Sequence, residues 1–578
     1  MSFIQNPTPG APVIGLFAPC DPRIDTDSRI RALNIVEMTA KVLTAIKLPL
    51  GQVPGIYCAS KAIQGEADAD AVAQEFKNAG VAVIAIVPDT WFYPGKTAIA
   101  LTSHFPRTTP ICCLAGNNAP KPGVVGVDAA VGAYAQTGIL CHAIIGNMPE
   151  VGMNPEFDAK TKGEIIDLVW AMTAAAWLRG KRVMCADVDS MQMETALNSV
   201  HAARRWLGIE SSRESMKLFA DMIRADSGFD KAELEQLYHW VTEKQWKGKI
   251  YTRAEELSAK KTSIYTDAKR APSAALSPEL QAKLKEELKL YLILRDFMKG
   301  INAIGGGWTS QLAWGSDRRG TPMACADIAE ALFNSTFDHT GKKAAMPFAT
   351  ENDFQGLLTM TCYSALTGGE PVLFADYRKV YEPWEIQRKA DELGVKLDPA
   401  AAYMKLGCID MDNSGSGSLD WADETFLFEV YGHYFPGGGF STGYLSKGGI
   451  ECVAGRIAYS DNNGLYTMVQ DEAVSVDLPA KVAEAFMHAS SYTWPHTFVS
   501  FKNVPASVNK YCCPANHIHM VKNLPKRRWQ YFSDYTNILN AEWECCERKF
   551  VEGLDRVAPM LYRTMGGEMA AKLKLGSR

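Results

Sequence analysis

Three short segments, far apart in the chain, each offer one side chain that can bind a hard or borderline divalent cation. Glu351 lies in ATENDFQGLLTM, Asp376 lies in VLFADYRKV, and His517 lies in CCPANHIHM. Two carboxylates and one imidazole suit Mn²⁺, Mg²⁺ or a similar ion that keeps coordination positions open for a substrate. Carboxylates at such a site can also move protons. The three segments therefore indicate metal-assisted chemistry.

Each of these side chains also has an ordinary structural interpretation. Glu351 precedes a helical run, where the helix macrodipole favours an acid, and Asp353 fits the role of the helix cap. Asp376 ends the apolar run PVLFAD and could be a turn residue, although one strand–helix–strand step after Glu351 would bring both carboxylates to neighbouring strand ends. His517 and His519 would face the same side of a strand, where a histidine is more often a hydrogen-bonded structural residue. Spacing alone thus leaves both interpretations open.

Composition indicates a large globular protein of several domains. At ~150 residues per domain, a chain of 578 residues suggests three or four units. Hydrophobic content of 47% and charged content of 22% are ordinary, and a net charge of −5 argues against a nucleic-acid-binding protein. The apolar runs are far shorter than the ~20 residues of a membrane-spanning helix, so we expect no membrane association. Because no secretory signal is visible and the 14 cysteines lack zinc-type spacing, we expect a cytoplasmic protein with reduced thiols.

The N-terminal part of the chain, residues 1–178, alternates short apolar runs with segments of helical spacing. This alternation predicts a Rossmann-like α/β domain, in which helices cover both faces of a parallel sheet. We expect strands at 11–19, 55–60, 81–89, 110–116 and 139–146. We expect helices at 28–46, 66–79, 127–137 and 161–178.

A second α/β domain with a parallel sheet is expected over 179–352, with Glu351 at its end. Its clearest element is a helix at 278–299, with Ser277 as the cap and Gly300 after its end. Beyond this domain, over residues 353–578, glycine, asparagine and aromatic residues become frequent. Turn residues between β-branched and aromatic runs predict a β-rich, barrel-like domain that would carry Asp376 and His517.

The segments around the candidate ligands resemble the L-fucose isomerase family, which includes D-arabinose isomerases. The matching stretches are ATEND at 349–353, FAD at 374–376, NSGS at 413–416, FPGGGFS at 435–441, TWP at 493–495 and ANH at 515–517. Further matches are TWFYPG at 90–95, RWLGIE at 205–210 and AEALFNSTFDHTG at 329–341. They occur in the family's order across nearly the whole chain, which makes their joint occurrence specific.

The resemblance implies two N-terminal α/β domains, a β-rich C-terminal domain and a Mn²⁺-dependent aldose–ketose isomerase. It implies a hexamer in which a neighbouring subunit completes each active site, and Mg²⁺ or Co²⁺ are the other cations to consider. The family's metal ligands fall on Glu351, Asp376 and His517, and His519 lies outside that set. Substrate-contacting positions of the family fall on Trp91, Gln311, Ser414, Tyr434, Trp494 and Asn516.

Two segments depart from the family pattern. Phe17 stands where family members carry an arginine near the first strand, and WTSQLAW at 308–314 replaces a segment with two glutamines. Both departures affect substrate-contacting parts and leave the ligand positions intact. The expected substrate is therefore L-fucose, D-arabinose or a related sugar, including an acidic or sulfonated one.

The reaction that the resemblance implies moves a proton between C1 and C2 of the sugar through a cis-enediol. A divalent cation stabilises the negative charge of that species, and a carboxylate within hydrogen-bond reach moves the proton. Glu351 and Asp376 are the candidates for base and acid, with their roles left open. Two alternatives are a metal-dependent aldolase, which also stabilises an enediolate, and a non-catalytic sugar-binding protein on the same scaffold.

Overall fold

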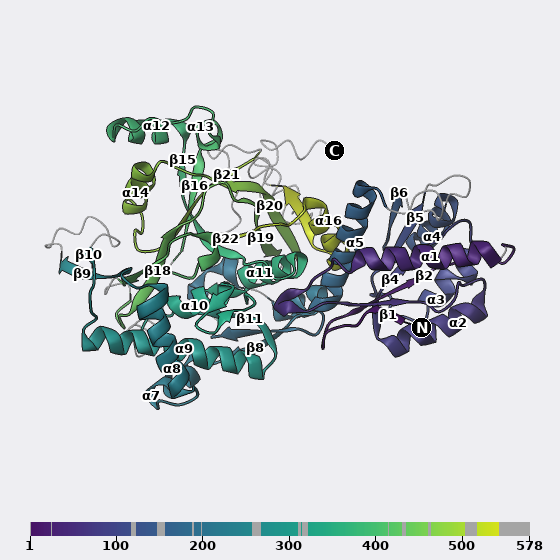
Figure 1. Ribbon diagram of the computed structural model, residues 1–578, viewed down its shortest axis with the longest axis horizontal. Helices are drawn as coiled ribbons and strands as arrows, with labels where there is room; N and C mark the ends of the chain where they lie inside the picture. The colour runs from purple at the N-terminus through teal and green to yellow at the C-terminus, as the bar shows by residue number, and fades with distance from the viewer. Residues whose placement is uncertain are drawn as a thin grey trace. The chain divides into compact units, whose positions relative to one another are not determined.

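The computed structural model of the chain divides into two compact units (Figure 1). The first unit comprises Met1–Arg179, Ala365–Gly369 and Pro525–Asn537, and the second comprises Gly180–Ser364, Glu370–Leu524 and the chain from Ile538 onward. The structure describes residues 2–24, 26–116, 123–146, 157–187, 190–197, 199–256, 268–309, 314, 322–413, 415–430, 435–460, 464–502 and 517–542. The finer division into domains 1–178, 179–352 and 353–578 stays a prediction.

In the described part of the first unit, six strands form one sheet in the order β1-β3-β2-β4-β5-β6. The strands are β1 (Ser2–Gln5), β2 (Val13–Phe17), β3 (Gly55–Cys58), β4 (Val81–Ile86), β5 (Ile111–Gly116) and β6 (Cys141–Gly146). All neighbouring pairs are parallel except β1 with β3, an antiparallel edge pair that the sequence pattern did not predict. The helices are α1 (Thr26–Leu43), α2 (Glu66–Ala79), α3 (Ala98–Thr102), α4 (Val124–Gln136), α5 (Ala159–Leu178) and α16 (Lys526–Thr536).

Alternation along β2 explains why helices cover both faces of this sheet. Ile14 and Leu16 point into a core shared with α1, α5 and α16, whereas Val13 and Phe17 point into a core shared with α2, α3 and α4. Buried side chains on both faces are what a parallel sheet requires. The predicted doubly covered sheet is therefore confirmed.

The second unit contains a parallel sheet of four strands within its described residues, in the order β14-β11-β7-β8. These strands are β7 (Arg182–Ala186), β8 (Glu210–Glu214), β11 (Ala303–Trp308) and β14 (Phe348–Thr350). The helices of this part are α6 (Val200–Ala202), α7 (Met216–Arg224), α8 (Lys231–Trp240), α9 (Pro278–Gly300), α10 (Asp327–Asn334) and α11 (Phe354–Thr367). The Ser277 hydroxyl caps α9 by accepting from the Leu280 amide, as predicted, and the helix includes Gly300 rather than ending before it.

The rest of the second unit is built around a larger sheet, whose described strands run in the order β10-β9-β17-β18-β21-β16-β15-β22-β19-β20-β23. They are β9 (Ile250–Glu256), β10 (Ala268–Pro272), β15 (Leu373–Tyr381), β16 (Cys408–Asp412), β17 (Phe426–Glu429), β18 (Phe440–Leu445), β19 (Glu451–Ser460), β20 (Leu465–Ser475), β21 (Pro495–Phe501), β22 (His517–Val521) and β23 (Leu539–Glu542). Because β20 also pairs with β21, the strands β21, β16, β15, β22, β19 and β20 close into an antiparallel barrel. The predicted α/β fold with a C-terminal barrel is confirmed.

Short elements complete the second unit. A two-stranded hairpin joins β12 (Phe337–Asp338) to β13 (Gly341–Lys342), and helices α12 (Pro383–Glu392), α13 (Ala402–Leu406) and α14 (Ala480–His488) connect barrel strands (Figure 1). One hydrophobic core includes Phe348 of the parallel sheet together with Ile409 and Val499 of the barrel, so the two sheets share a single interior. In the ranges that the structure describes, each helix is too short or too polar to cross a membrane.

Candidate active site

Glu351 lies in a tight turn that joins β14 to α11, as the sequence predicted. Glu351 and Asn352 both have left-handed backbone conformations, with φ of 59° and 51°. A left-handed conformation in a non-glycine residue costs about 1–3 kcal/mol of folding free energy, so contacts with surrounding groups must stabilise it. The Asn352 amide N–H donates to the Trp308 carbonyl at 2.8 Å, and the Ser190 hydroxyl donates to the Asn352 carbonyl at 2.8 Å. These contacts fix the direction of the Glu351 side chain.

Asp376 and His517 lie directly opposite one another on the neighbouring barrel strands β15 and β22. Side chains opposite one another on paired antiparallel strands project from the same face, which brings this carboxylate and imidazole together. The sequence pattern allowed Glu351 and Asp376 to lie close together at neighbouring strand ends; the two carboxylates are close, but Asp376 lies inside β15 and not at its end. Glu351 follows a strand of the parallel sheet, whereas Asp376 lies within a barrel strand, and α11 connects the two.

The three predicted ligands nevertheless converge on one point. His517 Nε2 lies 3.0 Å from Glu351 Oε2 and 3.2 Å from Asp376 Oδ1. His517 is fully buried and Glu351 is 7% exposed. His517 Nε2 makes no hydrogen bond of standard geometry within the described residues, although both carboxylate oxygens lie within ion-pair distance of it.

Asp353 contacts the other nitrogen of the same imidazole. His517 Nδ1 lies 2.7 Å from Asp353 Oδ2, and a protonated Nδ1 that donates to this carboxylate leaves Nε2 unprotonated in the neutral ring. Burial raises the pKa of Asp353, but Arg456 and His517 outweigh burial and hold it well below its ordinary value. Arg456, which is 1% exposed, donates to both Asp353 oxygens at 2.5 and 2.8 Å. The chain Arg456–Asp353–His517 therefore orients the imidazole.

Asp353 also caps α11, because its Oδ1 accepts from the Gly356 amide at 2.9 Å. The predicted capping role is confirmed, and the contact with His517 is an additional role that sequence reasoning missed. His519 is buried, with Nε2 3.4 Å from Arg456 Nη1. Burial and the positive charge of Arg456 lower the pKa of His519 well below its ordinary value. His519 thus contacts the group that orients His517 and has no contact with Glu351 or Asp376 among the described residues.

The other side of Asp376 is held by polar groups of the barrel. Asn413 Nδ2 donates to Asp376 Oδ1 at 2.8 Å, and Arg378 Nη2 lies 2.8 Å from Asp376 Oδ2. Arg378 Nε donates to Asp412 at 2.5 Å, and its guanidinium carbon lies 5.4 Å from the centre of the Trp494 ring. Burial raises the pKa of Asp376, whereas His517, Arg378 and Asn413 lower it, and the net shift is downward. Asp376 is therefore kept ionised.

A second group of metal-type residues, Asp410, Asp412 and His496, lies next to Arg378, with ligand atoms within 4.8 Å of one another. Both imidazole nitrogens of His496 face acceptors, because Nδ1 is 2.9 Å from Asp410 Oδ1 and Nε2 is 3.1 Å from the Ser491 carbonyl. Burial lowers the pKa of His496, but Asp410 and Asp412 raise it to about 9 overall. Each imidazole nitrogen of His496 thus already faces an acceptor, and Asp412 also accepts from Arg378, so these groups form an ion-pair network that supports Arg378.

Two buried carboxyls on α10 extend the acidic character of the site. Burial raises the pKa of Asp327 to about 7, and the charge of Glu351 acts in the same direction. Burial, together with the charges of Asp327 and Glu351, raises the pKa of Glu330 well above its ordinary value. Both groups hold protons under conditions where exposed carboxyls are ionised. Sequence reasoning did not identify either residue.

The predicted substrate-contacting residues are only partly described. Trp494 is 2% exposed and packs in a small core with Cys325, Val430 and Phe435. Trp91 belongs to the first unit, where its ring packs edge-on against Tyr93 at 5.7 Å between centres. The other four predicted contacts lie outside the described residues, namely Gln311, Ser414, Tyr434 and Asn516.

Phe17, where the sequence departs from the family pattern, is a core residue of the first unit. The Phe17 side chain is fully buried in the core that β2 shares with α2, and its ring centre lies 6.3 Å from that of Phe76. A side chain in this core cannot contact a sugar.

Comparison with known proteins gives a consistent result. Residues 11–180 match the family model for the first N-terminal domain of L-fucose isomerase, and residues 184–368, which include Glu351, match the model for the second. The chain is 26% identical over 511 residues to L-fucose isomerases of Escherichia coli strains SMS-3-5 and K12, an alignment that covers 81% of this chain and 80% of each relative. The two models together match more than half of the chain. The protein therefore belongs to the L-fucose isomerase family and is an enzyme of the aldose–ketose isomerase class.

Proposed function

We propose that this enzyme interconverts L-fucose, D-arabinose or a related aldose with its ketose, and that it requires a divalent cation bound by Glu351, Asp376 and His517. The observation that carries the proposal is the convergence of His517 Nε2 on two carboxylate oxygens at 3.0 and 3.2 Å, without a hydrogen bond of standard geometry among the described residues. Two ligand atoms at about 2.1 Å from one cation and at right angles to each other are about 3.0 Å apart. The donor set thus fits Mn²⁺, with Mg²⁺ and Co²⁺ as the other candidates.

The fit also follows from electrostatics. A neutral imidazole with its lone pair toward two carboxylates is repelled by them, so the arrangement is stable only with a positive charge between the three groups. Either a proton on Nε2 or a cation supplies that charge, and without a cation the neighbouring carboxylates raise the pKa of His517 well above its ordinary value despite burial. The Asp353 contact favours the cation, because a carboxylate that accepts from the far nitrogen is the usual support of a metal-bound histidine.

The residues of the site have different proposed roles in the reaction. When bound, the cation would act as a Lewis acid that stabilises negative charge on the sugar oxygens of the cis-enediol. Arg378 and Asn413 keep Asp376 ionised. In the described residues Glu351 contacts only His517 through its carboxylate, so it is the freer of the two to take up and return a proton. We therefore assign Glu351 as the base that moves the proton between C1 and C2, and Asp376 as the fixed anion.

Trp494 and Trp91 would offer flat apolar faces to the C–H surface of the sugar, and the positions outside the described residues would contact its hydroxyls. We further propose that the enzyme is a cytoplasmic hexamer in which a neighbouring subunit completes each site, as the resemblance implies. These parts of the proposal depend on the family and not on the geometry of the site.

A panel of aldoses and ketoses, each incubated with the purified enzyme and Mn²⁺ and followed by ¹³C NMR, tests the proposal. We expect one aldose to give a ketose with the same number of carbons. Cleavage into two fragments would instead identify an aldolase. Sugar binding without any conversion, across neutral, acidic and sulfonated substrates, would identify a non-catalytic sugar-binding protein.

A further inference from the structure

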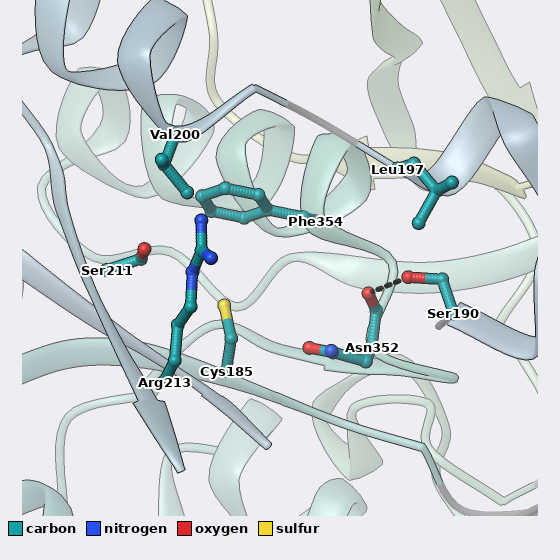
Figure 2. Close-up of a pocket in the computed structure, with 8 residues that line it drawn as sticks. All are labelled: Cys185, Ser190, Leu197, Val200, Ser211, Arg213, Asn352 and Phe354. Atoms are coloured by element: carbon teal, nitrogen blue, oxygen red, sulfur yellow. Dashed lines mark hydrogen bonds between the residues drawn. The ribbon is translucent and has the colours of Figure 1, made fainter. Parts of the chain in front are cut away.

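A cavity of about 290 Å³ lies beside the turn that carries Glu351, within the second unit (Figure 2). Ser211 and Arg213 of β8 contribute to its wall from one face of the parallel sheet, because alternate residues of a strand point to the same side. Asn352 and Phe354 approach from the turn and from the start of α11. The cavity is therefore distinct from the space between Glu351, Asp376 and His517.

Two polar groups in this cavity lack partners. Asn352 is 3% exposed, and its side-chain oxygen Oδ1 accepts no hydrogen bond, although its amide nitrogen donates to the Asp187 carbonyl. Figure 2 shows this oxygen directed toward the part of the cavity that contains Arg213. Arg213 is an exposed residue of β8 that forms no hydrogen bond or ion pair among the described residues, and its guanidinium lies between Ser211 and Phe354 in the figure. A buried acceptor without a donor indicates a missing hydrogen-bond partner, and the exposed Arg213 beside it offers a cation to an anionic ligand.

We propose that this cavity binds a small hydroxylated anion, either a sugar phosphate or a sugar acid. The Arg213 guanidinium would pair with the phosphate or carboxylate in a charge-assisted contact. A ligand hydroxyl would donate to Asn352 Oδ1, with the Ser211 hydroxyl as a further partner. Phe354 and Leu197 provide an apolar wall for the carbon chain. A volume near the lower end of ligand pockets fits a single sugar unit better than a nucleotide.

The position of the cavity connects it to the catalytic turn. The Ser190 hydroxyl, which lines the cavity, donates to the Asn352 carbonyl, and the Leu197 carbonyl accepts from the Gln355 side chain. A bound ligand would therefore touch the residues that hold Glu351 in its left-handed conformation. The binding itself does not depend on the proposed isomerase reaction.

Isothermal titration calorimetry on the full-length protein tests the proposal, with D-glucose 6-phosphate, D-gluconate and uncharged D-glucose as probes. We expect at least one anionic probe to bind more tightly than D-glucose. Arg213→Gln should weaken that binding at least tenfold, and Ser211→Leu, which fills part of the cavity, should also weaken it. Arg205→Gln is the matched control, because Arg205 is an exposed arginine of the same unit that contacts Trp206 outside the cavity.

The two anionic probes distinguish the possible sources of the ligand, because tighter binding of the phosphate indicates a sugar phosphate and tighter binding of gluconate indicates a sugar acid. The proposal is overturned if neither anion binds, if D-glucose binds equally well, or if both cavity variants retain wild-type affinity. Heat of binding is measured without turnover, so a failure of the isomerase proposal leaves this result unaffected.

Discussion

Replacement of Asp353 by asparagine tests whether the carboxylate that contacts His517 Nδ1 strengthens metal binding. The substitution keeps the size of the side chain but removes the negative charge that contacts His517 Nδ1 at 2.7 Å. Loss of such a supporting carboxylate typically weakens metal affinity about 10–100-fold, which corresponds to about 1.4–2.8 kcal/mol. We therefore expect Asp353→Asn to raise the dissociation constant for Mn²⁺ by this factor.

The same substitution also destabilises the fold, and this effect must be separated from the first. Arg456 is 1% exposed and would lose its anionic partner. Removal of one member of a buried ion pair costs about 3–5 kcal/mol. The matched control is Asp167→Asn in the first unit, because Asp167 is 3% exposed and accepts from Arg528 Nε at 3.0 Å. We expect this control to lower the thermal midpoint of unfolding without changing Mn²⁺ affinity.

The assay is calorimetric titration of Mn²⁺ into each metal-depleted variant at a temperature where circular dichroism shows that all three proteins are folded. Wild-type affinity in Asp353→Asn would refute the role of Asp353 in orienting His517. An equal loss of affinity in Asp167→Asn would show that the effect comes from general destabilisation and not from the imidazole.

Four further predictions concern the same region. Glu351→Gln should abolish isomerisation with an unchanged circular dichroism spectrum, and near-normal turnover would contradict its role as base. Chelation with EDTA should remove activity and Mn²⁺ should restore it, whereas a fully active preparation shown by elemental analysis to be free of metal would disprove the metal requirement. Arg378→Met should lower kcat/KM about 10–100-fold because Asp376 loses its 2.8 Å partner, and unchanged kinetics would show that the ion pair is incidental. His496, with a folded pKa of about 9 against an ordinary value of 6.5, should stabilise the protein fully below pH 6.5 and lose that contribution as pH rises through 9. The difference in thermal midpoint between wild type and His496→Gln should therefore shrink over this range, and a constant difference would contradict the assignment.

Local pattern was sufficient to predict much of the secondary structure. The strands and helices of the first unit follow from alternating runs, as β2 illustrates, because Ile14 and Val13 must both be buried on opposite faces. The edge strand Ser2–Gln5 was missed because its SFIQ sequence is short and mixed in polarity. Which strands pair within the barrel, and that β20 closes on β21, depends on contacts distant in sequence that no local pattern contains.

In the candidate site, too, local sequence predicted some features, whereas others depend on contacts between residues distant in the sequence. Residue types and family resemblance together identified Glu351, Asp376 and His517, and the structure brings these three side chains together. Asp353 was interpreted only as a cap, because its second partner, Arg456, lies far away in the sequence. A signal for Arg456 was present, since a single arginine within the apolar run CVAGRIAY is rarely buried without a partner.

Closure of the barrel has a consequence for how this protein can diverge from its relatives. Because the ring leaves neither β15 nor β22 as an edge, a shift of one strand past the other would have to propagate through every strand of the ring. Asp376 and His517 are thereby locked face to face, whatever happens in the loops at the ends of their strands. Loops at the strand ends can then change in sequence while the facing atoms of Asp376 and His517 stay in place, which fits a chain that is 26% identical to its relatives over the aligned residues.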